Sequence, residues 1–150
     1  QCAADAFVDT ASTIAGVLVT KNETLSFNIG DSKVYNVNNG YLQQVSTDDT
    51  VFGLIKEEPD STKAIKPPLL QYIGKSNLET NCHIKALSNV KELMICSDGL
   101  TDLVETDDIE EILEKYTVPM EMVHMLYNKA MENGGYDNIS IVYIQLENDK

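Results

Sequence analysis

The sequence contains no arginine, and its eleven basic residues, all lysine, stand against 24 acidic ones. The formal net charge is −13 at pH 7. A protein that binds duplex nucleic acid needs a basic surface to neutralise phosphates, so this deficit excludes that class and argues against anionic membranes as partners. Two interpretations of the acidic excess stay open: a solvated surface on helices and the C-terminal end, or a concentration around a cation site.

Cysteine is scarce as well. Cys2, Cys82 and Cys96 are odd in number and form no Cys-x-x-Cys pair, which excludes a disulfide framework and a structural zinc site. Cys96 lies in an apolar run and is interpreted as a buried thiol. The sequence shows no signal peptide and no apolar run of membrane-spanning length, so we expect a cytoplasmic, reducing environment.

The length of 150 residues, with 43% hydrophobic content, suits one domain with a real core. Internal repeats and low-complexity tracts are absent. The chain begins at Gln1 rather than Met, which leads us to expect a processed or excised piece of a longer protein.

Alternation of apolar and polar residues predicts most of the strands. In the first third it indicates an antiparallel meander, with a tight turn at Asn38-Asn39-Gly40 where Asn and Gly tolerate positive φ. The expected strands are 14–20, 24–29, 33–37, 41–45, 69–73, 83–87, 93–96 and 139–146. The last of them is apolar on both faces, which is typical of a strand buried between layers.

Helices are expected in three places. A short one is predicted within residues 1–13. Another begins at the cap Thr106, and a third begins near Pro119 and stops at Gly134-Gly135. The charged, proline-containing loop within residues 51–68 is either an ordinary surface connection or a flap beside a site.

Three acidic residues share one context, because Asp31 and Asp98 follow strands and Asp137 precedes one. Strand ends and starts can lie on the same rim of an antiparallel sheet, where carboxylates repel each other unless a cation neutralises them. Oxygen ligands select magnesium, manganese or calcium. For Ser97-Asp98-Gly99 alone, a turn in which the carboxylate bonds nearby amides is the competing interpretation.

Short motifs around these residues occur in a characteristic order. They are Thr10-Ala11-Ser12-Thr13, Gly30-Asp31-Ser32-Lys33-Val34-Tyr35, Ser97-Asp98-Gly99-Leu100 and Gly134-Gly135-Tyr136-Asp137-Asn138-Ile139, with the polar Thr47-Asp48-Asp49-Thr50 between the second and third. Their order and spacing resemble the metal-dependent protein serine/threonine phosphatases of the protein phosphatase 2C type, most of all the compact bacterial members. The resemblance covers nearly the whole chain.

That resemblance implies an α+β fold in which two antiparallel sheets pack face to face with flanking helices. Residues 1–150 would form the C-terminal two-thirds of such a catalytic domain. The resemblance makes Asp98 and Asp137 ligands of a dinuclear manganese or magnesium centre and Asp31 a weaker candidate for a third metal. Gly99 and Asn138 would bring their backbone close to the ion.

The activity implied by the resemblance is hydrolysis of phosphoserine and phosphothreonine in proteins by a metal-activated water. Phosphorylated proteins, and a cognate serine/threonine kinase with its substrates, are the implied partners. Because no covalent phosphoenzyme is implied, Cys96 is not expected to be a nucleophile. His83 and His124 are interpreted as structural or surface residues.

The chain also departs from the family pattern. It lacks the Arg/Asn-Glu-Asp and Asp-Gly-x-Gly-Gly elements that supply the bridging ligand and a phosphate-binding arginine. Lys33 follows Gly-Asp-Ser, and Asp49 holds the histidine position of the bacterial Thr-x-Asp-His element. We therefore expect the chain alone to be inactive, either as a fragment of a phosphatase or as a catalytically dead domain that binds a partner.

Overall fold

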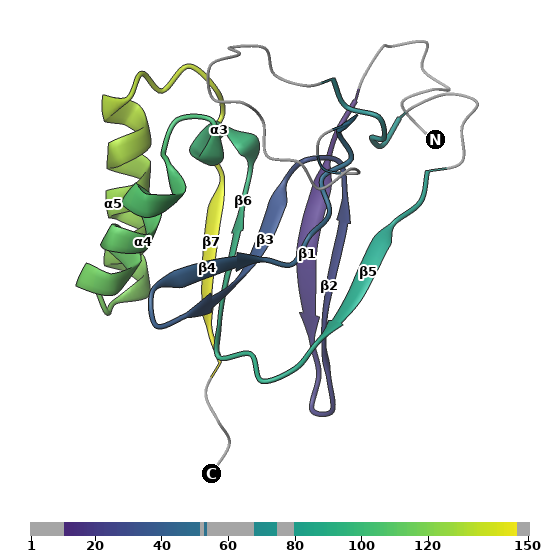
Figure 1. Cartoon of the computed structure of the whole chain (residues 1–150), viewed down its shortest axis with the longest axis horizontal. Helices are drawn as coiled ribbons and strands as arrows, with labels where there is room; N and C mark the ends of the chain where they lie inside the picture. Colours follow the sequence, from purple (N-terminus) through teal and green to yellow (C-terminus); the bar gives the residue numbers. More distant parts are fainter. Residues whose placement is uncertain (1–10, 52, 54–67, 75–79, 147–150) are drawn as a thin grey trace.

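The computed structural model describes residues 11–51, 53, 68–74 and 80–146. Within them, strands pair into two antiparallel sheets, a small one of order β1-β2-β5 and a large one of order β4-β3-β6-β7 (Figure 1). The strands are β1 (Ile14–Val19), β2 (Thr24–Ile29), β3 (Lys33–Asn38), β4 (Tyr41–Gln44), β5 (His83–Leu87), β6 (Glu92–Cys96) and β7 (Ile141–Gln145). The expected α+β class with two antiparallel sheets is confirmed.

The predicted meander of the first four strands is wrong in its pairing. The chain leaves the small sheet after β2 and enters the large sheet at β3, so these consecutive strands lie in different sheets. The crossover is Gly30–Ser32, where Gly30 has φ of 101° and a Cβ would lie 2.4 Å from Cγ2 of Thr13. A residue with a side chain would be strained there, and glycine lets the chain turn out of the sheet.

The turn between β3 and β4 forms as predicted. Asn38 pairs with Tyr41, which leaves Asn39 and Gly40 as a two-residue loop with φ of 51° and 85°. Positive φ at both positions gives a turn whose twist matches that of the flanking strands.

Helices α3 (Asp98–Thr101), α4 (Thr106–Lys115) and α5 (Pro119–Glu132) lie beside the large sheet (Figure 1). Strand residues such as Met94 and Cys96 form a core with Leu100 of α3, Ile109 of α4 and Leu126 of α5. Each of these side chains is at most 2% exposed. The large sheet therefore has an apolar helical layer on one face.

The helix ends follow the sequence signals with one correction. The N-cap of α4 is Glu105 and not Thr106, which is already helical. Helix α5 begins at Pro119, where a missing N–H costs nothing. It ends before Gly134 and Gly135, both at positive φ, and the amide of Gly135 donates to the carbonyl of Ala130.

The second core lies between the two sheets. Val34 and Leu93 of the large sheet are fully buried, and Ala15, Val17 and Leu87 of the small sheet pack against them. This cluster is the face-to-face packing that the fold expectation required.

The outer face of the small sheet is apolar. By the strand register, Ile14, Leu18, Leu25, Phe27 and Ile84 share this face, opposite the side that packs on the large sheet. Ile14, Leu18 and Ile84 are 40%, 53% and 68% exposed. Among the described elements the helices pack substantially only on the large sheet, so they do not provide the flanking layer expected on this side.

Strand β7 only partly fits the expected burial. Ile141 and Tyr143 pack on the helical core and Ile144 on the core between the sheets, so both faces do contact apolar layers. Val142 is nonetheless 51% exposed because β7 ends the strand order of the large sheet.

The remaining expectations concern the loop regions. Residues 69–73 are not a strand, since they make only isolated bridges from Leu69 to Thr50 and from Ile73 to Ser12. The first ten residues of the predicted helix 1–13 and most of the loop 51–68 lie outside the described residues. In the part of the chain that the structure describes, no helix is both long and apolar enough to cross a membrane.

Candidate metal centre

The three acidic motifs meet at one rim of the large sheet. Strand register pairs Lys33 of β3 with Cys96 of β6, and Cys96 with Ile141 of β7. Asp31 lies just before β3, Asp98 just after β6 and Asp137 just before β7. Antiparallel pairing therefore brings the three segments to the same edge of the sheet.

A hydrogen-bonded joint holds two of these segments together. The amide of Ser97 donates to the carbonyl of Ser140, and the amide of Ser140 donates to Oγ of Ser97; both donor–acceptor distances are 3.0 Å. Oγ of Ser97 in turn donates to the carbonyl of Asn138 at 3.0 Å. A Cβ on Gly99 would lie 2.3 Å from that carbonyl oxygen, so glycine is required at the position.

The two acids beside this joint differ in setting. Asp98 opens the short helix α3, and its carbonyl accepts the amide of Asp102 at 2.8 Å. Asp137 is exposed, and its Oδ1 accepts the amide of Asn138 at 2.7 Å. That bond is a local turn contact of the kind that the sequence had suggested for Asp98, and it leaves the second oxygen of Asp137 for other ligands.

Asp31 lies in the crossover and is 7% exposed. The crossover is tied to the small sheet side by a 2.8 Å bond between the hydroxyls of Ser32 and Thr13. Asp31 is thus carried by a segment fixed on both sides.

Cys96 lies directly beneath the rim and is buried. Burial, with smaller contributions from Asp48 and Asp98 and an opposing one from Lys33, raises the pKa of its thiol to about 12. Because the thiolate is the nucleophilic form, this thiol is inert at neutral pH.

Comparison with known proteins decides the family. The family model for protein phosphatase 2C matches residues 1–133. The chain belongs to the protein phosphatase 2C family. It is 27% identical over 141 residues to a protein of Listeria welshimeri named serine/threonine phosphatase stp, covering 89% of this chain and 56% of that protein.

Solved phosphatase 2C structures share the fold. The crystal structure of the Mycobacterium tuberculosis serine/threonine phosphatase PstP/Ppp superimposes with a TM-score of 0.75 at 26% identity, over 91% of this chain and 60% of that one. The catalytic domain of PstP in complex with two manganese ions matches with a TM-score of 0.72 at 25% identity, over 89% and 57%. The chain thus spans little more than half the length of these relatives.

The rim of this phosphatase 2C chain has the kind of ligand atoms that a hard cation binds, but too few of them. Its carboxylates offer the oxygen atoms that manganese and magnesium bind. Among residues 11–51, 53, 68–74 and 80–146, however, no group of three or more His, Cys, Asp or Glu side chains is placed to hold an ion. The described residues alone therefore do not form a complete metal site.

Two adjacent acids near the rim have contacts that the motif pattern did not predict. Asp48 forms an ion pair with Lys33 and accepts Nε2 of Gln44 at 2.6 Å. Asp49 is fully buried and contacts three further segments. The sequence marked these acids only as part of a short polar stretch at the place of the bacterial Thr-x-Asp-His element, which does not identify their partners.

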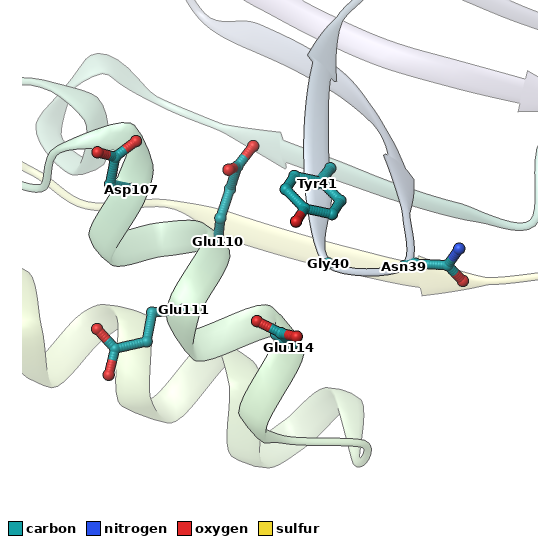
Figure 2. Close-up of a pocket in the computed structure, with 7 residues that line it drawn as sticks. All are labelled: Asn39, Gly40, Tyr41, Asp107, Glu110, Glu111 and Glu114. Carbon is teal, nitrogen blue, oxygen red and sulfur yellow. The ribbon is translucent and has the colours of Figure 1, made fainter.

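A surface hollow elsewhere is strongly acidic but remote from the rim. It lies between the β3–β4 turn and α4 (Figure 2). Its lining residues are Asn39, Gly40, Tyr41, Asp107, Glu110, Glu111 and Glu114. Glu110 is already engaged, since its Oε1 accepts the amide of Leu42 at 2.8 Å. The hollow follows the end of β3, whereas Asp31 precedes its start, so it is no part of the candidate metal centre.

Proposed function

We propose that the complete protein containing this chain is a manganese- or magnesium-dependent protein serine/threonine phosphatase. The observation that carries the proposal is the joint between Ser97 and Asn138–Ser140, which brings the segments of Asp98 and Asp137 to one rim in a member of this family. The names of its relatives, serine/threonine phosphatases, support phosphorylated proteins as substrates. In this proposal a cognate serine/threonine kinase is the source of the phosphate.

In this proposal Asp98 and Asp137 hold the metal, and Asp31 lies at the same rim as a further ligand. Gly99 and Asn138 keep the two segments close, because a larger residue at position 99 would push them apart. Bound manganese or magnesium supplies a water of lowered pKa for attack on phosphorus and positive charge beside the phosphoryl oxygens.

The chain by itself is proposed to be inactive. Two carboxylate segments cannot fill the coordination sphere of a hard cation, and the described residues contain no larger ligand group. The remaining ligands would come from a segment of the complete protein that corresponds to the part of its relatives not spanned by this chain.

The direct test is phosphate release from a phosphothreonine peptide by the chain extended to its natural start, with and without manganese. We expect metal-dependent turnover that falls about a hundredfold or more in Asp98→Asn and Asp137→Asn, since each removes a charged ligand. Asp107→Asn, on the exposed start of α4, is the matched control and should keep full activity. Absence of turnover in the extended wild type would refute the proposal.

A catalytically dead domain that binds a protein partner or a phosphoprotein is the second candidate. One observation favours it: Lys33, the basic residue nearest the rim in sequence, is engaged by Asp48, and the chain has no arginine for a phosphate group. Calorimetric titration of the extended protein with the same phosphopeptide separates the two functions, because this candidate requires binding without turnover.

A further inference from the structure

Asp49 is a buried carboxylate that the proposed metal centre does not use. It is 0% exposed. Its Oδ2 accepts the amide of Gly30 at 2.8 Å, and its Oδ1 accepts Nε2 of Gln71 at 2.8 Å and Nε2 of His83 at 2.7 Å. A carboxylate can only accept, so His83 donates through Nε2. Burying a carboxylate costs free energy unless donors satisfy its oxygens in this way. Displacing any partner of Asp49 would therefore destabilise the folded protein.

The backbone of Asp49 adds two more bonds to the same neighbours. Its amide donates to the carbonyl of Gly30 at 3.0 Å, and its carbonyl accepts the amide of Leu70 at 2.7 Å. Gly30 is therefore held through both its N–H and its C=O by a single residue. Nearby, Asn28 of β2 bonds both backbone groups of Thr47, which fixes the stretch that carries Asp49.

The neighbouring acid holds the other side of the crossover. Asp48 pairs with Lys33, the first residue of β3, while Asp49 holds Gly30, the residue after β2. Asp31 lies between these two anchors. Asp48 and Asp49 thus bind the chain one residue before Asp31, at Gly30, and two residues after it, at Lys33.

We propose that Asp48-Asp49 is a positioning clamp that fixes the Gly30–Ser32 crossover and so sets the place of Asp31 at the rim. Asp49 is the principal member, because it is fully buried and bonds Gly30 directly. The role in metal binding rests on the proposed function, whereas the role in fixing the crossover does not.

The test uses Asp49→Ala and Asp49→Asn in the complete protein, with Glu111→Ala on the exposed side of α4 as matched control. Amide hydrogen exchange followed by NMR reports the crossover without any need for activity. We expect exchange at Gly30 to rise about tenfold or more in Asp49→Ala, the effect of one lost charge-assisted hydrogen bond. Asp49→Asn keeps an acceptor oxygen and should recover part of the protection.

The second readout is the manganese concentration that gives half-maximal phosphate release. It should rise about fivefold or more in Asp49→Ala while turnover at saturating manganese recovers, because the clamp places a ligand and does not contact the phosphate. If Asp49→Ala lowered only the global stability and did not displace Asp31, the folded molecules would still need the same manganese concentration for half-maximal phosphate release.

The outcomes separate the two proposals. Unchanged exchange at Gly30 in both variants overturns the clamp, whatever the activity. Raised exchange with unchanged manganese dependence overturns its role at the rim. If wild type releases no phosphate, the proposed function fails, and the exchange result still decides whether the clamp fixes the crossover. Should Asp49→Ala not fold, Asp49→Asn against Glu111→Ala gives the same comparison.

Discussion

At the scale of single residues, we expect the rim acids to contribute little to the stability of the metal-free protein or to lower it. Like charges gathered at one sheet edge repel each other when no cation is bound. We expect Asp98→Ala and Asp137→Ala, unfolded by urea in the presence of a chelator, to change the free energy of unfolding by less than about 0.5 kcal/mol or to raise it.

Leu100→Ala serves as the contrasting variant in that series. Leu100 is fully buried two residues after Asp98 in α3, and its truncation should cost about 2–5 kcal/mol. If Asp98→Ala lost a similar amount in the metal-free protein, the acid would be a structural part of the turn and not a ligand.

Cys96 gives a second residue-scale prediction, on pH. Its folded pKa of about 12 lies above the ordinary 9.0, so the thiol of the unfolded chain ionises first as pH rises. Its stabilising contribution is complete below about pH 9 and is lost between about pH 9 and 12. The urea midpoint should therefore fall less from about pH 8 to about pH 10.5 in Cys96→Val than in wild type.

The exposed Cys82 is the control for that measurement. Cys82→Ala should keep the alkaline loss of wild type, since its thiol is accessible in the folded protein. Equal alkaline losses in Cys96→Val and wild type would contradict the assignment.

At the scale of elements, period-two alternation predicted where the strands lie but not how they pair. Strands 24–29 and 33–37 were located almost to the residue. Alternation reports which face of a strand is apolar, and a strand in either sheet of a sandwich has such a face. The sheet change at Gly30 could therefore not be read from the pattern, although a glycine before an acid marked the break.

In the candidate site, too, features that depend on neighbouring residues were predictable from the sequence, whereas contacts between distant residues were not. Asp31, Asp98 and Asp137 were expected at one rim because each adjoins a strand end, and the register agrees. The side-chain partners of Asp49, Gln71 and His83, lie 22 and 34 residues away along the chain, and no local pattern links them to it. Contacts of this kind depend on the packing of loops, which sequence periodicity does not describe.

The β3–β4 turn carries an element-scale prediction. Gly40 has φ of 85°, and a Cβ there would lie 3.2 Å from atoms of Glu114 in α4. Gly40→Ala should lower the free energy of unfolding by about 1–2 kcal/mol, measured by urea titration. Asn39→Gly, at a positive φ that glycine adopts freely, should be neutral or stabilising. Equal effects of the two changes would contradict the turn geometry.

At the scale of the whole molecule, the described part of the fold is one-sided. Helices cover the large sheet, whereas the outer face of the small sheet exposes Ile14, Leu18 and Ile84. An apolar sheet face of this kind favours association or the binding of apolar dyes. We expect the isolated chain to enhance the fluorescence of an anilinonaphthalene sulfonate probe.

The matched variants for that prediction place charge on and off this face. Leu18→Lys combined with Ile84→Lys should reduce the dye signal strongly, whereas Met120→Lys, at an exposed position on α5, should not. A chain that binds no dye, or equal effects of the two changes, would mean that the face is covered in solution.

The joint at the rim also has a consequence for the order in which the protein assembles. Asn138 and Ser140 lie 41 and 43 residues after Ser97. Contacts that distant form late in folding, and a chain emerging from the ribosome cannot make them until β7 follows β6. Until β7 has been synthesised, the nascent chain carries β6 with one edge unpaired, and a chain cut before β7 would present Asp98 without the segment that closes the rim.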